Sequence, residues 1–147
     1  MAQADFYILE QFDDHSRFLT VCRLVEKALR HGHRIHIHTQ TQEQAEELDQ
    51  LLWSFRPDSF IPHSLQDEPD ALEAPVTLGH QDLSTSLKPF DEAALLINLA
   101  EQIPDFFTRF QRIAEVSTQQ PGLLSATRDH FRFFRERGYN TTSHRLK

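Results

Sequence analysis

Hydrophobic residues along this chain fall into short continuous runs that alternate with segments in which they recur every three or four residues. Short apolar segments predict strands at 5–9, 34–39, 75–79 and 93–99, and an alternating segment predicts a further strand at 112–116. The run at 93–99 is apolar throughout, which is typical of a central strand that is covered on both faces of a sheet.

The periodic segments lie between these runs and predict helices. One begins at a cap formed by Asp14 or Ser16 and ends at Gly32, and others cover 42–55, 104–110 and 123–137, the last ending at Gly138. The polar stretch 66–73 predicts a solvated loop, and another loop ends near Pro89. Strand–helix alternation predicts an α/β fold with a mainly parallel sheet and right-handed crossovers.

One aromatic segment, residues 51–63, departs from this regular pattern. Trp53 is the single tryptophan and lies about 120° from the centre of the apolar stripe on its helix, counting 100° per residue. Phe60 and Ile61 lie between Pro57 and Pro62 and are predicted to form an edge strand or an extended connector. Trp53 and Phe60 are therefore candidates for a docking pair. The alternative is that Trp53 packs beneath its own loop.

Composition narrows the class of protein. A chain of 147 residues with 39% hydrophobic and 25% charged residues is expected to form one soluble domain, 1–147, with a real core. No apolar run approaches the ~20 residues of a membrane span, and the N-terminal residues do not resemble a secretory signal. The single cysteine, Cys22, excludes an internal disulfide. We expect a buried structural thiol and a cytoplasmic protein.

Charge is distributed unevenly. The net charge is −7, but residues 121–147 carry six basic and two acidic side chains, a net +4, which leaves −11 on the preceding 120 residues. The acidic body disfavours nucleic-acid binding, whereas the basic end favours an acidic peptide or phosphates. On the last helix Arg128, Arg132 and Arg135 share one face beside Phe131 and Leu124. This stripe predicts a site for a short acidic peptide with a hydrophobic end, unless it is only a solvated face.

Catalytic and cofactor motifs are largely absent. The four glycines lie far apart in the sequence, so neither a P-loop nor a dinucleotide-binding fingerprint occurs. Four of the nine histidines lie in 31–38, and His36 and His38 point to one face of the predicted strand. The alternative function is thus a metal- or nucleotide-dependent α/β enzyme that uses this region. We expect instead that these imidazoles are hydrogen-bonded beneath a helix, and we predict no cofactor, metal site or catalytic residue.

The order of these features resembles the chi subunit family of bacterial DNA polymerase III over essentially the whole chain. The resemblance rests on residues 5–9, on 48–53 leading into Ser59-Phe60-Ile61-Pro62-His63, on the strand entry at 74–76, and on 128–140 with its Gly138-Tyr139-Asn140 end. Proteins of this family are three-layer α/β/α domains with a Rossmann-like, P-loop-like topology but no phosphate loop. They are not enzymes themselves.

The resemblance also implies partners. Chi subunits join the clamp loader through the psi subunit and bind the acidic, phenylalanine-ended C-terminal tail of the single-stranded-DNA-binding protein; an iron–sulfur helicase is a further possible partner. Trp53 and Phe60 match the psi-facing aromatics. Arg128, Phe131 and Arg132 match positions that hold the tail, with Leu124 where the family can have a lysine and Phe131 where it can have a tyrosine.

Overall fold

The structure is a computed structural model that describes residues 2–58, 60–83 and 90–146; Ser59, Pro89 and Lys147, each used in the sequence argument, lie outside these ranges. In chain order the elements are β1 (Gln3–Leu9), α1 (Asp14–Arg30), β2 (Ile35–His38), α2 (Gln42–Ser54), β3 (His63–Leu65), η1 (Pro69–Leu72), β4 (Val76–Gly79), β5 (Leu95–Asn98), η2 (Asp105–Arg109), β6 (Arg112–Ser117), α3 (Pro121–Glu136) and β7 (Asn140–Leu146), where η marks a 3₁₀ helix.

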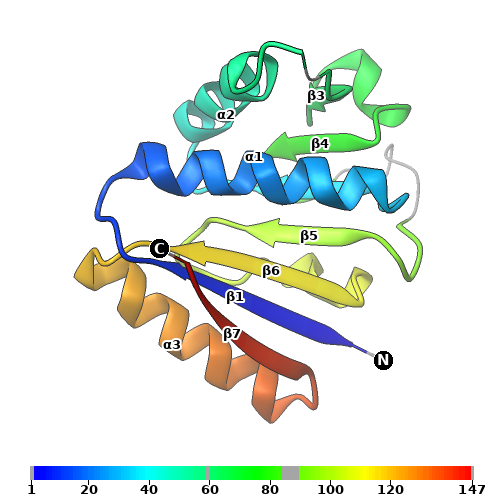
Figure 1. The fold of residues 1–147 in the computed structure, drawn as a ribbon. Helices are drawn as coiled ribbons and strands as arrows, with labels where there is room; N and C mark the ends of the chain where they lie inside the picture. Colours follow the sequence, from blue (N-terminus) through cyan, green and yellow to red (C-terminus); the bar gives the residue numbers. More distant parts are fainter. Residues whose placement is uncertain (1, 59, 84–89, 147) are drawn as a thin grey trace.

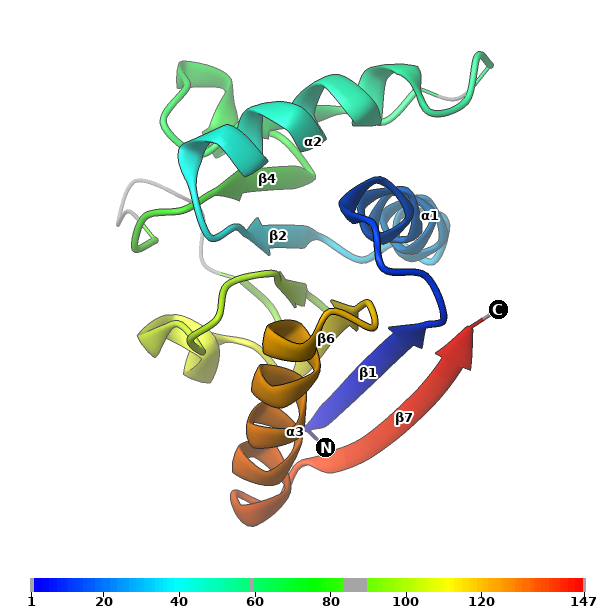
Figure 2. The same ribbon diagram turned by 90° about the vertical axis from the view of Figure 1, so that its left-hand side faces the viewer.

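The strands form one open sheet in the order β3-β4-β2-β5-β6-β1-β7, and every neighbouring pair is parallel. Figures 1 and 2 show α1 and α2 on one face of this sheet and α3 on the other. The predicted three-layer α/β architecture with a parallel sheet is thus confirmed. β5 lies in the middle of the sheet, as its continuous apolar run predicts.

Two cores lie on the two faces of the sheet because side chains alternate along each strand. On β1, Phe6 points into the core beneath α3, whereas Tyr7 and Leu9 contact the core beneath α1 and α2. Cys22 belongs to the core beneath α1 and α2 and is fully buried, as the prediction of a buried structural thiol requires. Burial raises the pKa of this thiol to about 12.

The predicted elements are present, with corrections at their ends. Asp13, not Asp14 or Ser16, caps α1, and its carboxylate accepts a hydrogen bond from the Ser16 amide at 2.8 Å. Gly32 and Gly138 follow α1 and α3 with φ angles of 79° and 86°, the left-handed backbone that commonly ends a helix. The segment 104–110 forms only the 3₁₀ helix η2.

Three features were not predicted. β3 and β7, the two edge strands, had no strand prediction, and the supposed solvated loop 66–73 contains η1. Ala71 of η1 is 2% exposed and belongs to the core on the α3 face, so this connection is packed against the molecule and not solvated throughout.

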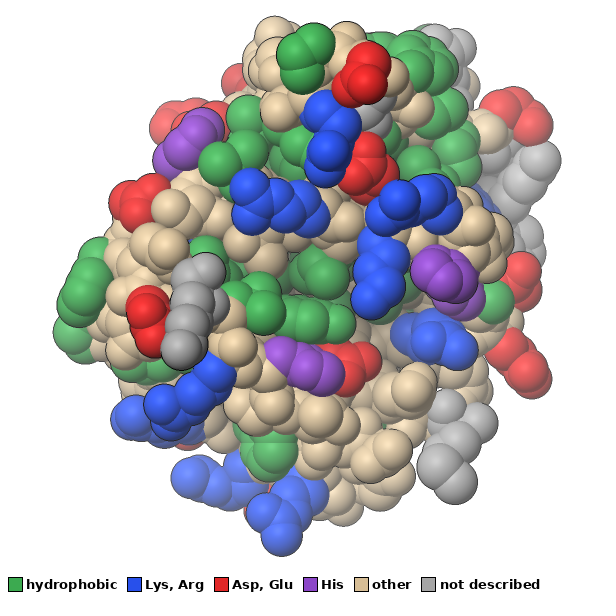
Figure 3. Space-filling model, viewed as in Figure 1, with side chains coloured by type: hydrophobic (Ala, Val, Ile, Leu, Met, Phe, Trp, Pro, Cys, Tyr) green, Lys and Arg blue, Asp and Glu red, His purple; other side chains and the backbone are tan. Residues whose placement is uncertain are grey.

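Basic side chains do not gather only at the C-terminal end. Figure 3 shows lysine and arginine side chains over α1 as well as over α3, with hydrophobic side chains between them. Among the described residues no helix combines the length and apolar character needed to cross a membrane.

Candidate binding surfaces

Trp53 and Phe60 form an exposed aromatic patch at the β3 edge of the sheet. Trp53 lies in the last turn of α2 and is 49% exposed, and Phe60 lies in the connector to β3 and is 72% exposed. Their ring centroids are 5.6 Å apart. Phe60 is outside any strand, so its segment is the extended connector, and Ile61 beside it is buried and fixes that connector to the core. Trp53 is therefore not packed beneath its own loop.

His63 supports this aromatic patch from below. Its ring centroid lies 4.3 Å from that of Trp53, and its side chain is fully buried. Nδ1 lies 2.6 Å from the carbonyl oxygen of Ile61, and Nε2 lies 3.1 Å from that of Asp49 and 3.2 Å from the Asp49 carboxylate. These contacts join α2, the connector and β3, so His63 holds the two exposed rings on a fixed base. The sequence analysis used His63 only as part of a motif and missed this role.

A hollow of about 610 Å³ opens beside Phe60. Its walls include Leu29 and Arg30 of α1, Arg56, Ile61 and the prolines at 62 and 75. Arg56 and Glu26 form an ion pair across it at 3.1 Å. An apolar side chain of a partner has space to enter next to the exposed ring, which is how hot-spot residues commonly bind.

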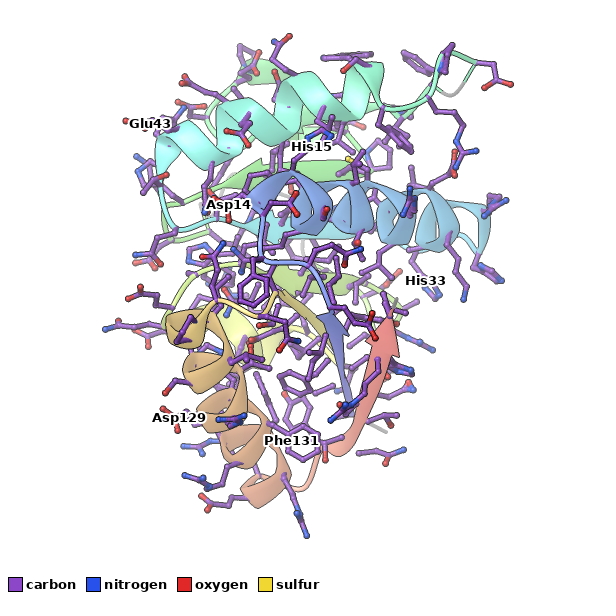
Figure 4. All side chains as sticks on the ribbon, turned by 60° about the vertical axis from the view of Figure 1, so that its left-hand side comes forward. Asp14, His15, His33, Glu43, Asp129 and Phe131 are labelled. Carbon is purple, nitrogen blue, oxygen red and sulfur yellow. The ribbon has the colours of Figure 1, made fainter. Side chains whose placement is uncertain are left out.

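At the opposite edge of the sheet, a groove of about 340 Å³ lies between α3 and the strands β1 and β7; we call it the α3 groove. Its apolar lining includes Phe6 and Ile8 of β1 and Phe131 of α3, and the centroids of the two phenylalanine rings are 5.2 Å apart. Thr127 and Ser143 complete the lining with hydroxyl groups. Figure 4 shows Phe131 between α3 and the strands, whereas Asp129 points away from the sheet.

Arg128, Arg132 and Arg135 line the same groove, as the stripe predicted. Arg132 lies 3.8 Å from Asp129, and both side chains are highly exposed, so this ion pair holds the guanidinium only weakly. Arg128 and Arg135 form no ion pair within the described part of the chain. The groove thus combines an apolar floor with three exposed cations.

Two other residues of α3 have different surroundings. Leu124, which was expected at this site, is half-buried and is not among the residues that line the groove. Arg137 lies over the ring of Phe133, 3.6 Å from its centroid, and lines a separate hollow with His130. Phe6 and Ile8 were not predicted at this site because β1 is distant from α3 in the chain, and Ser143 was not predicted because β7 has no local strand pattern.

A buried polar network fixes α3 to the sheet. His130 Nδ1 lies 2.8 Å from both carboxylate oxygens of Glu115 on β6, and Nε2 lies 2.8 Å from the Glu101 carbonyl oxygen. Asn98 of β5 donates a hydrogen bond to Glu115 at 3.2 Å. Burial raises the pKa of Glu115, although the bonds from His130 and Asn98 oppose this shift. Burial alone would lower the pKa of His130, but the hydrogen bond and charge of Glu115 outweigh it and the pKa is raised.

The histidines of 31–38 range from the exposed His31 to the fully buried His36. His36 is fully buried, hydrogen-bonded to Thr77 at 2.7 Å, and lies edge-on to Phe106 of η2, as does His38. The two rings therefore share a face beneath a short helix, as predicted. His36 has the expected hydrogen bond, whereas His38 Nδ1 is buried without a hydrogen-bond partner within the described part of the chain. Burial lowers the pKa of His36 to about 3, so it is neutral. No group of three potential metal ligands occurs among the described residues.

Fold and surfaces together define a class: an open, parallel α/β protein without a phosphate loop that presents an aromatic patch and a basic groove at opposite edges. The family described as "DNA polymerase III chi subunit, HolC" matches residues 1–142. The chain belongs to this family of DNA replication proteins.

Curated relatives agree with this assignment. The chain is 44% identical over 146 residues to DNA polymerase III subunit chi of Pseudomonas aeruginosa, covering 99% of this chain and 98% of that protein. It is 29% identical to the chi subunit of Haemophilus influenzae, covering 95% and 94%, and 28% identical to that of Escherichia coli, covering 95% of each chain.

Proposed function

We propose that this protein is a non-catalytic accessory subunit of the DNA polymerase III holoenzyme. In this function it links the clamp loader, through the psi subunit, to the C-terminal tail of the single-stranded-DNA-binding protein during replication, in the cytoplasm. Membership of the chi family over residues 1–142 supports the replication role. The observation that carries the linking role is the presence of two unlike exposed surfaces at opposite edges of one sheet.

The α3 groove supports binding of the tail. A peptide that ends in phenylalanine brings one apolar ring, a terminal carboxylate and flanking acidic side chains. Phe6, Ile8 and Phe131 provide an apolar floor for the ring. Arg128 and Arg135, which form no ion pair within the described residues, provide guanidinium groups that bind carboxylates through paired hydrogen bonds.

The aromatic patch supports docking of psi. Tryptophan and phenylalanine are large rings that lose little conformational freedom on binding, and here the buried His63 fixes their base in advance. The iron–sulfur helicase is a second candidate for the same surface, in which case the two partners compete. The acidic body disfavours direct nucleic-acid binding, so the protein contacts DNA through its partners.

Isothermal titration with the acidic tail peptide, with and without its final phenylalanine, tests the first contact. We expect a dissociation constant of roughly micromolar size, because a short peptide pays an ordering cost on binding. Removal of the final phenylalanine is expected to weaken binding by at least about tenfold, since both the ring and the position of the terminal carboxylate are lost. Equal heats for the two peptides would contradict tail binding in this groove.

Mixing the full chain with purified psi, followed by size-exclusion chromatography, tests the second contact. We expect one complex, and helicase added in excess should displace psi if the two share the aromatic patch. The alternative enzyme function has its own test: stoichiometric zinc after dialysis, or strong thermal stabilisation by a nucleotide, would favour a metal- or nucleotide-dependent activity. Neither result is expected.

A further inference from the structure

A second groove lies on the other face of the same two strands. It has a volume of about 520 Å³ and runs between α1 and the strands β1 and β7; we call it the α1 groove. Its apolar lining comprises Tyr7, Leu9, Leu19, Leu24 and Leu146. Figure 3 shows this face, with hydrophobic side chains below the basic side chains of α1. Because β7 is the edge strand of the sheet, the groove opens to solvent along that edge.

Among the described residues, cations line the α1 groove and no carboxylate does. Arg23 and Lys27 line it, both are exposed, and neither forms an ion pair within the described residues. No aspartate or glutamate is among its lining residues. The nearby Asp5 is held by His144 Nε2 at 2.9 Å, and the His144 ring stacks on Tyr7 with centroids 4.7 Å apart. In a stretch of 120 residues with a net charge of −11, a groove with this lining is a local exception.

The cations of α1 repeat the spacing found on α3. Arg23, Lys27 and Arg30 lie at i, i+4 and i+7, as Arg128, Arg132 and Arg135 do. Side chains at this spacing form one row along a helix. Arg30 extends the row beyond the α1 groove to the hollow beside Phe60. The β1–β7 edge therefore has an apolar groove with a basic row on each face.

We propose that the α1 groove binds an acidic peptide segment that carries one large apolar side chain. Carboxylates of such a segment pair with Arg23 and Lys27, and the apolar side chain packs against Leu19, Leu24 and Leu146. A nucleic acid matches this surface less well, because its phosphates gain nothing from the leucine floor and are repelled by the acidic body. This inference does not depend on what the α3 groove binds.

The test uses the full-length, isotope-labelled chain with Arg128→Ala, so that binding in the α3 groove is weakened. The probe is a synthetic aspartate-rich peptide with one central leucine and blocked ends, which has no terminal carboxylate. Titration followed by NMR is expected to shift the backbone amides of α1 and of the C-terminal end of β7. Replacement of the leucine by serine in the probe should weaken binding, because the apolar contact is lost.

Charge reversal then identifies the cations. Arg23→Glu combined with Lys27→Glu is expected to weaken probe binding by about tenfold or more, since two attractions become repulsions. The matched control, Arg109→Glu with Arg112→Glu, makes the same change in net charge at exposed positions outside the groove. It should change affinity by less than about threefold, through long-range charge alone. Should the reversed variant fail to fold, Arg23→Gln with Lys27→Gln removes the charges at similar size.

The following outcomes would contradict the proposal. Amide shifts confined to α3, equal loss in the control variant, or affinity unchanged by the substitutions at 23 and 27 would exclude binding in the α1 groove. Displacement of the probe by a single-stranded oligothymidylate at lower concentration than the probe itself would show that the cations serve nucleic acid instead. Tail-peptide titration of the Arg23/Lys27 variant with Arg128 restored separates this test from the proposed function, because the α3 groove is intact there.

Discussion

The aromatic patch and the α3 groove lie at opposite edges of one sheet and differ in which side chains protrude and which are recessed. At the patch, Trp53 and Phe60 project outward from a base that His63 holds in place. At the α3 groove, Phe6 and Phe131 lie recessed and the exposed groups are arginines. One surface offers apolar side chains to a partner, and the other offers an apolar recess with cations around it.

If both surfaces bind partners as proposed, their difference keeps the two contacts separate. A protruding aromatic pair selects a partner with a complementary apolar recess, whereas a recessed floor with cations selects an acidic chain with an apolar end. Because the surfaces are at different edges, a partner on one does not block the other. The two contacts should therefore respond independently to substitution and to salt.

The largest expected effect is at the patch. Trp53→Ala with Phe60→Ala should weaken psi or helicase association by far more than tenfold, since typical hot-spot residues contribute ~2–4 kcal/mol. The variant should unfold at nearly the wild-type temperature because Phe60 is largely exposed and Trp53 is about half exposed. Binding is measured by surface plasmon resonance and folding by circular dichroism.

Phe12→Ala is the matched control for this variant. Phe12 is 64% exposed and lies in the connection between β1 and α1, away from α2. Its loss should leave partner binding unchanged. If the double variant instead loses its folded structure, Trp53 and Phe60 stabilise the core and the docking role is wrong.

The next effect is at the groove. Arg128→Ala should weaken tail-peptide binding by roughly three- to tenfold, because one exposed charge pair is lost. Arg137→Ala should cost less, since Arg137 stacks on Phe133 and lies outside the groove. Calorimetric titration compares the two variants. Equal losses would mean that the tail responds to the charge of α3 as a whole and not to the groove.

The sequence alone predicts the main features of both surfaces. The position of Trp53 off the apolar stripe indicated exposure, and the spacing of the three arginines indicated a row on α3. Both signals are local, because a helix has a fixed period. Short apolar segments likewise located β1, β2, β4 and β5, and alternation located β6; each of these strands exchanges hydrogen bonds with two neighbours in the sheet.

The edge strands were missed for a physical reason. β7 reads Asn-Thr-Thr-Ser-His-Arg-Leu and lacks the apolar alternation that identifies a half-buried strand. It forms because it pairs with β1 along seven residues, a long-range contact that leaves no local signal. Phe6 and Ile8 of β1 and Ser143 of β7 line the α3 groove, so this part of its lining could not be predicted from the local sequence either. Helix periodicity therefore predicts the row of arginines on α3, whereas the groove beside that row depends on strand pairing that the local sequence does not show.

Salt provides a smaller and more discriminating test of the comparison. Raising ionic strength from about 0.05 to about 0.5 M shortens the screening length several-fold, so tail-peptide affinity should fall by roughly an order of magnitude or less. Association at the aromatic patch should change little, because its contacts are apolar. Parallel titrations at each salt concentration measure both slopes. Similar slopes would show that the two surfaces are not electrostatically distinct.

The smallest expected effect concerns the network that holds α3. The pKa of His130 is raised above its ordinary value of 6.5, so its stabilisation is fully present below that value and is lost as pH rises through the folded pKa. The pKa of buried Glu115 is also raised above its ordinary value of 4.5, so it too makes the folded state bind protons more strongly than the unfolded chain. Above pH 6.5, where His36 is neutral in both the folded and the unfolded states, both groups therefore predict that the free energy of unfolding decreases as pH rises. Urea titrations across this range measure the slope. His130→Gln retains a hydrogen-bond donor without the titrating ring and should flatten the slope. An identical slope in wild type and His130→Gln would mean that the ion pair does not couple proton binding to the docking of α3.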